Sequence, residues 1–268
     1  MRDFHAHTNY SDGKFLRGMV QAAAAAGLEG IGFTDHCTVS SRERPATVRN
    51  VYGFNLDLTY ERRRRAIETE REREDVSIEI YDGVEMDYDP RDERQIREFL
   101  AEANFDYTIG SVHGVDGLNV QVPSNFAQMT EAELDGVVDD YFATLVSLVE
   151  SELFDVAAHL DLVERTAPLR GRATMDHYER VAEALAASRT VPEINAGRAV
   201  SDAALVHPSD PFLETLRAHD VSVTVGTDSH RPNEIGERAA FLEEYLAERG
   251  IEPVAPPGLE PEPGSDRE

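Results

Sequence analysis

The chain has 268 residues, 41% of them hydrophobic, and carries a formal net charge of −26. This length and apolar content are ordinary for a single α/β barrel with a sizeable core. The acidic balance disfavours general binding to nucleic-acid phosphates, and no apolar run in the sequence is long enough to span a bilayer.

The numbers of lysine and cysteine residues indicate the environment in which the protein works. Lys14 is the only lysine among 26 basic residues, against 52 acidic ones. This balance favours adaptation to high salt, where screening shortens the range of repulsion between surface carboxylates. A single cysteine, Cys37, excludes an internal disulfide. The first predicted strand starts at once with no signal peptide pattern before it, so we expect a cytoplasmic protein.

Short apolar runs alternate with helical patterns along the sequence. The predicted strands are residues 1–5, 30–34, 77–85, 107–110, 156–158, 191–194 and 221–225. The predicted helices lie near residues 16–26, 60–74, 92–103, 131–152, 175–187, 211–219 and 234–249. The alternation implies parallel strands joined by right-handed crossovers, and seven strands predict an α/β barrel that is irregular or one strand short.

The pattern predicts one domain over residues 1–252 and a disordered acidic, proline-rich tail over residues 253–268. Residues 61–75 are mostly charged and include four consecutive arginines, Arg62 to Arg65. These arginines are open to interpretation as a nucleic-acid patch, but the alternation of Glu and Arg favours a solvated helix with i,i+4 ion pairs.

Potential metal ligands follow six of the seven predicted strands. His5 and His7 are two apart, so both point to the same side of a strand, and Asp12 follows in the turn Ser11-Asp12-Gly13. The later strands are followed by four single residues and one pair: His36, Glu85, His113, His159, and Asp228 with His230. Functional residues of α/β barrels collect at the carboxyl ends of strands, so we expect these side chains to converge. We interpret the other three histidines, His177, His207 and His219, as surface residues.

Nine candidate ligands are too many for one tetrahedral ion and predict two or three ions that share a bridging carboxylate. Glu85 is the natural bridge because it is the only glutamate in the set. Imidazole and carboxylate ligands without thiolate fit Zn, Mn or Fe(II).

The set resembles the PHP (polymerase and histidinol phosphatase) family over residues 1 to about 235. It is carried by His5-Ala6-His7-Thr8, Ser11-Asp12-Gly13, Thr34-Asp35-His36, Glu85, His113, His159 and Asp228-Ser229-His230. The resemblance implies a distorted seven-stranded (β/α)7 TIM-like barrel with three metal positions. It implies these groupings: His5, His7, Glu85 and Asp228; Glu85, His113 and His159; Asp12, His36 and His230.

Two divalent ions roughly 3.5–4 Å apart can clamp the attacking and leaving oxygens of a displacement at phosphorus. We therefore predict hydrolysis of a phosphate ester. Arg198 and Arg165 are candidates to bind the phosphate, because the arginine fork matches phosphate oxygens, and Asn195 is a candidate hydrogen-bonding partner. Asp12, His230 or a metal-bound water are candidates to protonate the leaving oxygen.

Strings at residues 111–113 and 193–195 look like the stand-alone histidinol phosphatase branch, whereas residues 114–119 depart from it. The first functional hypothesis is therefore a phosphomonoesterase of histidine biosynthesis acting on L-histidinol phosphate, a small-molecule phosphate ester. A second is a phosphodiesterase that trims short oligonucleotides or acts on nucleotide phosphates. In that case Arg42, Arg44 and Arg49 are the candidates to hold the strand. A third is a non-catalytic metal-binding partner protein.

Overall fold

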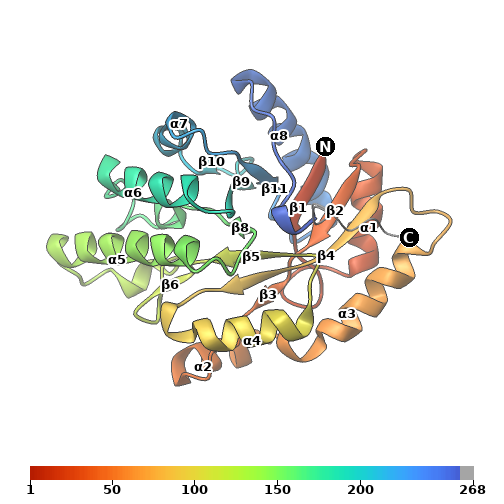
Figure 1. The fold of residues 1–268 in the computed structure, drawn as a ribbon, viewed down its shortest axis with the longest axis horizontal. Coiled ribbons are helices and arrows are strands. Elements are labelled where there is room, and N and C mark those ends of the chain that lie inside the picture. The colour runs from red at the N-terminus through yellow and green to blue at the C-terminus, as the bar shows by residue number, and fades with distance from the viewer. Residues whose placement is uncertain (260–268) are drawn as a thin grey trace.

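A computed structural model describes residues 1–259 of the chain. The strands are β1 Arg2–Ala6, β2 Gly30–Phe33, β3 His36–Cys37, β4 Glu79–Asp87, β5 Tyr107–Ser111, β6 Gly114–Val115, β7 Leu118–Asn119, β8 Val156–Ala157, β9 Val191–Arg198, β10 Leu205–His207 and β11 Thr224–Gly226. The α-helices are α1 Leu16–Ala25, α2 Glu43–Tyr52, α3 Leu56–Arg71, α4 Glu93–Ala103, α5 Glu131–Glu150, α6 Met175–Ala186, α7 Asp210–Ala218 and α8 Pro232–Arg249. Figure 1 shows the helices arranged around the sheet.

A strongly curled parallel sheet forms the centre of the molecule. Its strands run in the order β1-β2-β4-β5-β8-β9, with β11 beside β9, and each of these pairs is parallel. A backbone bridge between Ala6 and Ser229 joins β1 to the segment after β11, so the two edges of the sheet meet. The distorted seven-stranded barrel predicted from the sequence is confirmed.

Several short elements were absent from the sequence prediction. Strand β10 runs antiparallel to β9, which makes the sheet mixed, and β6 and β7 form a separate hairpin. Helix α2 has no buried residue, so its sequence carries no apolar periodicity by which it could be predicted. These additions lie on the loops around the carboxyl ends of the strands.

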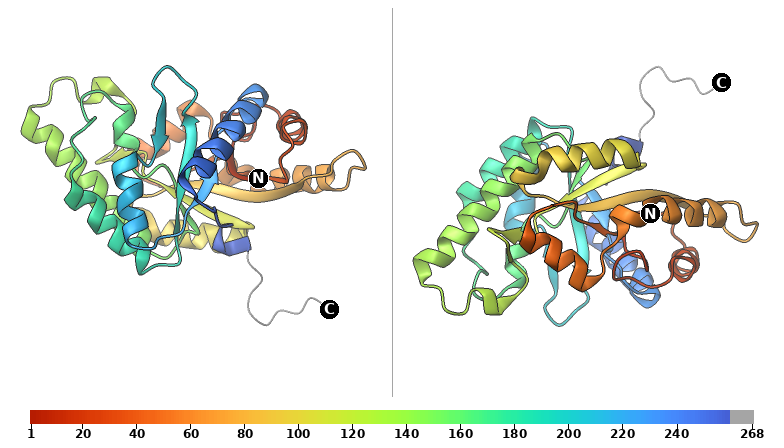
Figure 2. Two further views of the ribbon diagram at one scale, coloured as in Figure 1. Left: turned by 90° about the horizontal axis from the view of Figure 1, so that it is seen from above. Right: turned by 90° about the horizontal axis from the view of Figure 1, so that it is seen from below.

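Helix packing closes the seam between the first and last strands. Met19 of α1 belongs to the same buried apolar cluster as Ile235 and Ala239 of α8. Figure 2 shows these two helices side by side, although they are far apart in the sequence. The first and last strands of the barrel are therefore held together by side-chain packing of α1 on α8 as well as by the backbone bridge.

The predicted solvated arginine helix is correct only for its outer face. Arg65 pairs with Glu61 on the surface, as expected. Arg63, however, is fully buried: its guanidinium lies 2.9 Å from Asp35 and 2.8 Å from Asp82. Arg64 also bonds to Asp82, at 2.9 Å. Helical periodicity explains the correction, because position 63 shares the inner face of α3 with buried Ile67.

Residues 253–259, assigned from the sequence to a disordered tail, lie against the barrel. The Val254 amide donates to the carbonyl oxygen of Val223 at 2.8 Å, and Leu259 packs on the apolar cluster that contains Phe4. The rest of the predicted tail, residues 260–268, lies outside the described residues. Among the helices of residues 1–259, none is long and apolar enough to cross a membrane.

Candidate metal centre

The candidate ligands come from one rim of the barrel. His5 lies on β1, His36 on β3 and Glu85 on β4. The others follow a strand directly: His7 and Asp12 after β1, His113 after β5, His159 after β8, and Asp228 and His230 after β11. Two of them, His159 and Asp228, have positive φ angles of 29° and 50°, a conformation that is strained for residues other than glycine.

The structure brings these side chains into three overlapping groups whose ligand atoms lie within 4.8 Å of one another. The groups are His5, His7 and Asp228; His36, Glu85 and His113; and His7, Asp12, His36 and His230. They resemble the groupings implied by the family pattern, with four differences. Glu85 does not join the group of His5, His7 and Asp228, and His159 joins none of the three. His36 also lies beside Glu85 and His113, and His7 also lies beside Asp12 and His230.

Glu85 stands at the middle of the cluster. Its Oε1 lies 3.0 Å from His159 Nε2 and 3.5 Å from His113 Nε2. Its Oε2 lies 2.7 Å from His36 Nδ1 and 3.4 Å from His5 Nε2. Each carboxylate oxygen therefore faces a different set of imidazoles, which is the arrangement that a bridging carboxylate requires.

The buried polar atoms of the cluster indicate that it is built for cations. His5 Nε2, both ring nitrogens of His7 and His159 Nδ1 have no hydrogen-bond partner among the described residues. Leaving buried nitrogens unpaired is costly, and the cost is removed when they coordinate a metal. Nitrogen and carboxylate donors fit Zn, Mn or Fe(II). Cys37 is buried and belongs to none of the ligand groups, and burial raises the pKa of its thiol.

Charges in the metal-free cluster are strongly coupled. Burial alone would raise the pKa of Glu85, but the imidazoles of His36, His5 and His113 hold it well below its ordinary value. Burial lowers the pKa of His7 to about 4 and that of His159 to about 4. Burial opposes the charged form of His36 as well, yet the Glu85 carboxylate raises its pKa to about 10. A cation would therefore displace a proton from His36 and find His7 and His159 already neutral.

Two carboxylates that received no role from the sequence orient the imidazoles. Glu193 Oε1 lies 2.7 Å from His5 Nδ1, and its Oε2 accepts the His159 amide at 3.2 Å. Asp87 Oδ1 lies 2.6 Å from His113 Nδ1. Such contacts fix the tautomer, leaving Nε2 of His5 and His113 unprotonated and free to bind a metal. Asp87 is two positions beyond Glu85 on the same strand face, a signal that was available in the sequence.

A close backbone approach makes room for the Glu193–His5 pair. A Cβ added at Gly226 would collide with Glu193 Oε1 and with the Cβ of His5. Glycine at this position of β11 is therefore what allows the buried carboxylate to reach the imidazole.

Asp35, inside the Thr34-Asp35-His36 string, is buried and holds the loop after β1. It accepts hydrogen bonds from the amide and hydroxyl of Thr8, both at 2.7 Å, and from the Ser11 hydroxyl at 2.8 Å. Arg63 binds its other side. This loop carries Asp12, whose Oδ1 lies 3.3 Å from His230 Nε2. Asp35 therefore acts on the position of Asp12 and is not placed among the ligand groups.

A cavity of about 380 Å³ opens beside Asp12 and His230. Its basic lining residues are Lys14, Arg165, Arg198, Arg231 and Arg238. Arg165 is largely buried, and its Nη2 lies 3.4 Å from Asp228 Oδ2 and 3.2 Å from Asn195 Oδ1. Arg198 is exposed, and Asn195 is fully buried. Arg165 and Arg198 thus border the metal centre, whereas Asn195 contacts its supporting residues Arg165 and Glu193.

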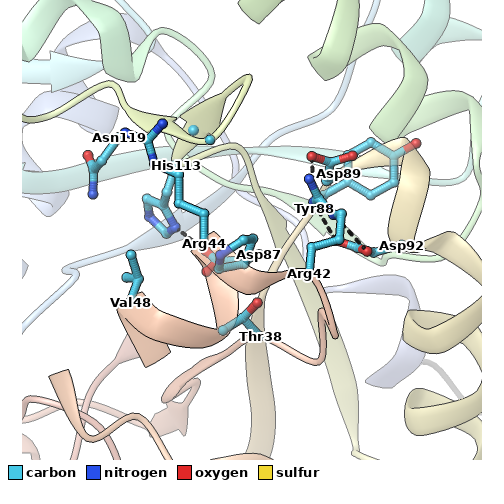
Figure 3. A pocket seen from close by; sticks show the side chains of 13 residues that line it. Thr38, Arg42, Arg44, Val48, Asp87, Tyr88, Asp89, Asp92, His113 and Asn119 are labelled. Carbon is cyan, nitrogen blue, oxygen red and sulfur yellow. Dashed lines mark hydrogen bonds and ion pairs between the residues drawn. The ribbon is translucent and has the colours of Figure 1, made fainter. Parts of the chain in front are cut away.

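A second, smaller cavity of about 110 Å³ adjoins His113. Its walls come from the loop before α2 and α2 itself, the end of β4, and the β6–β7 hairpin. Figure 3 shows Arg44, Asp87, His113 and Asn119 around one part of it, with Arg42 at the other end. Arg42 forms ion pairs with Asp89 at 2.7 Å and with Asp92 at 2.6 Å.

The surroundings of Arg42, Arg44 and Arg49 bear on nucleic-acid binding. Arg49 donates to the Thr38 carbonyl at 2.8 Å and lies 3.5 Å from Asp57. With Arg42 also paired, two of the three arginines that the oligonucleotide hypothesis needs are already neutralised.

Two of the three histidines predicted to be surface residues are buried. His177 caps α6 by accepting the Thr174 amide at 3.0 Å and bonds to Asp139. His207 is also buried and contacts Arg165. Only His219 is partly exposed, where it pairs with Glu179 at the end of α7. The two corrections share a cause, because each buried histidine is satisfied by a partner distant in sequence.

The fold and the ligand set define a PHP-domain protein: the chain belongs to the PHP family, whose domain model matches residues 3–196. It is 28% identical over 244 residues to the "Probable histidinol-phosphatase" of Deinococcus radiodurans, covering 89% of each chain. It is 28% identical over 239 residues to the "Histidinol-phosphatase" of Lactococcus lactis, covering 85% of this chain and 83% of the relative.

A solved structure has the same fold. It is the histidinol phosphate phosphatase of Lactococcus lactis, complexed with Zn, L-histidinol and phosphate. The two structures superpose with a TM-score of 0.74 at 24% sequence identity, over 97% of each chain.

Proposed function

We propose that this PHP-family protein is a metal-dependent phosphomonoesterase that converts L-histidinol phosphate to L-histidinol and phosphate. The observation that carries the proposal is the cluster of buried imidazole nitrogens without hydrogen-bond partners around Glu85, next to a cavity lined by arginines. The substrate is suggested by relatives named histidinol-phosphatase that align along most of the chain.

Two or three divalent ions, Zn, Mn or Fe(II), are proposed to bind the nine candidate ligands. The three groups of atoms described above would hold them, with His159 joining through Glu85 Oε1 and Glu85 Oε2 reaching toward His5. When bound, the ions supply a nucleophile at neutral pH and neutralise charge on the phosphate oxygens. Glu193 and Asp87 keep His5 and His113 in the tautomer that such binding requires.

The residues of the larger cavity are proposed to bind the phosphate. Arg165 is held at the edge of the metal cluster, and its guanidinium fork can donate hydrogen bonds to two phosphate oxygens. Arg198 and Lys14 add positive charge from the same wall, although the chain as a whole is strongly negative. Asn195 is proposed to act on the substrate by orienting Arg165.

The proton for the leaving oxygen is proposed to come from the Asp12–His230 pair. Burial would raise the pKa of Asp12, but its hydrogen bond with His230 and the nearby imidazoles hold it below the ordinary value. The same contact raises the pKa of His230 against the effect of burial. In the metal-free protein this contact favours the charged form of His230, and the pair is proposed to donate a proton only while it holds no ion itself.

The smaller cavity supports a small substrate. Its volume of about 110 Å³ suits the organic part of a monoester and not a nucleotide strand. The Asp87 carboxylate, which lines it beside His113, gives a cationic group such as the amine of L-histidinol phosphate an opposite charge to meet. Candidate ligands line both cavities, His113 the smaller one and Asp12 and His230 the larger one, so one monoester is proposed to reach from one to the other.

The test uses purified protein at high salt, loaded with Mn, Zn or Fe(II) and compared with chelator-treated protein. L-Histidinol phosphate, an aryl phosphate and a short oligonucleotide are offered separately. We expect metal-dependent release of phosphate from L-histidinol phosphate at a much higher kcat/KM than from the aryl phosphate. Cleavage of the oligonucleotide alone would favour the phosphodiesterase, and no turnover at all would favour a non-catalytic protein; either result refutes the proposal.

A further inference from the structure

Arg165 is held at its Nε by an imidazole. Its Nε donates to Nε2 of His207 at 2.9 Å. Because an arginine side chain is always protonated and never accepts, His207 Nε2 must supply a lone pair. The ring proton of His207 then lies on Nδ1, where it donates to Asp161 Oδ1 at 2.7 Å. These three side chains form a directed chain, Asp161–His207–Arg165.

The inner part of this chain, Asp161 and His207, is buried and hydrogen-bonded. Asp161 is fully buried and His207 is 1% exposed. The second oxygen of Asp161 accepts the backbone N–H of Ser209 at 2.8 Å, which fixes the carboxylate. Since both hydrogen-bonding atoms of the imidazole are engaged, its plane and its tautomer are determined.

The antiparallel strand β10 brings this imidazole to the site. His207 lies opposite Asn195 of β9, and Asn195 Oδ1 accepts from Arg165 Nη2 at 3.2 Å. Two residues that face each other across the strands thus contact two nitrogens of one guanidinium. Arg165 Nη1 has only a long contact, 3.5 Å, with Gln121. The same side chain lines the basic cavity beside Asp12 and His230.

We infer that His207, oriented by Asp161, is a positioning residue that sets the Arg165 guanidinium in the direction in which it receives the substrate phosphate. The identity of the anion rests on the proposed function. Arginine has many rotamers, so an arginine fixed before binding loses less conformational entropy when the anion arrives. An Asp or Glu at position 207 would fix the guanidinium too, but it would neutralise the charge meant for the phosphate. A neutral imidazole adds no negative charge to that of Asp228, which already lies 3.4 Å from Nη2.

Inorganic phosphate is the probe, titrated into Mn-loaded protein at high salt. Replacing His207 with leucine (H207L) removes both hydrogen bonds and should weaken phosphate binding about tenfold or more. In H207Q the amide oxygen can accept from Arg165 and the amide nitrogen can donate to Asp161, so affinity should stay within about threefold. The matched control is H219L, which removes a histidine paired with Glu179 and should change nothing.

A double-mutant cycle separates positioning from a general structural effect. In an R165M background, H207L should weaken phosphate binding less than about twofold further, because the group it positions is gone. If H207L weakens phosphate binding as much in the R165M background as in the wild type, or does not weaken it in the wild type, the inference is overturned. Metal content per chain is measured for every variant and should remain equal to that of the wild type.

Nitrogen NMR of the wild-type imidazoles gives a readout that does not depend on the folding of a variant. We expect the His207 proton on Nδ1, and a proton on Nε2 contradicts the inference. None of these measurements requires turnover. If the cycle shows coupling but no monoester is hydrolysed, the proposed function fails and the role of His207 stands; if monoesters are hydrolysed without coupling, the inference alone fails.

Discussion

Replacing Glu193 with glutamine exchanges one buried oxygen for an NH₂ group and tests how the metal centre is oriented. In the wild type, Oε2 accepts two N–H groups, from the His159 amide at 3.2 Å and from Asn195 Nδ2 at 3.1 Å. Oε1 faces His5 Nδ1 at 2.7 Å. A glutamine NH₂ in place of Oε2 would face two other N–H donors. The amide should therefore place its oxygen there and its NH₂ toward His5.

That orientation reverses the hydrogen bond to His5. The glutamine NH₂ can only donate, which forces the His5 proton from Nδ1 to Nε2, the atom that lies 3.4 Å from Glu85. His5 then cannot bind a cation through Nε2 without losing its proton or its hydrogen bond. Loss of such an orienting contact costs about 10–100-fold in metal affinity, or about 1.4–2.7 kcal/mol.

The assay is a competition between the protein and a chromophoric chelator for Zn or Mn, with thermal unfolding of the metal-free protein measured in parallel. The control, E183Q, makes the same chemical change at an exposed position on α6. If E193Q and E183Q bind metal with equal affinity while both remain folded, the assignment of Glu193 as the group that orients His5 is wrong.

Three further outcomes follow from the described contacts. R63M should cost about 3–5 kcal/mol of unfolding free energy, because it leaves two buried carboxylates without their cation, whereas R62M on the exposed face should be near neutral in the same urea titration. Metal affinity should rise from pH 7 toward pH 10, because the pKa of His36 is about 10 and binding of a metal ion displaces its proton. Calorimetry in buffers of different ionisation enthalpy measures the released proton. An affinity that does not change with pH contradicts the prediction. R165M should raise KM for the monoester about 100-fold and the exposed R198M less than about tenfold; steady-state kinetics that reverse this order would show that the phosphate binds at the outer wall.

The sequence predicts the barrel well because its strands carry two signals at once. Each is a short apolar run, and most end in a histidine, aspartate or glutamate, so both the element and its carboxyl end can be located. Helix α2 and strand β10 lack such signals. Helix α2 buries nothing, and the strand Leu205–His207 is too short to show alternation.

The candidate ligands are likewise visible in the sequence, but their supporting residues are not. Glu193 contacts His5 across 188 positions, and His207 contacts Asp161 across 46. No local periodicity reports on such pairs, so His207 is predicted to be a surface residue and Glu193 receives no role. Arg63 is misread for the same reason, since its partner Asp35 lies 28 positions away.

The seam where β1 meets β11 has a consequence for the order of assembly during synthesis. His5 is made long before Asp228, whose amide bonds to the His5 carbonyl oxygen at 2.7 Å. A nascent chain therefore cannot complete the ion-binding cluster until almost the whole barrel has left the ribosome. Until then the early imidazoles lack their partners, and ion binding becomes a late step that joins the first and last strands of the barrel and slows their separation.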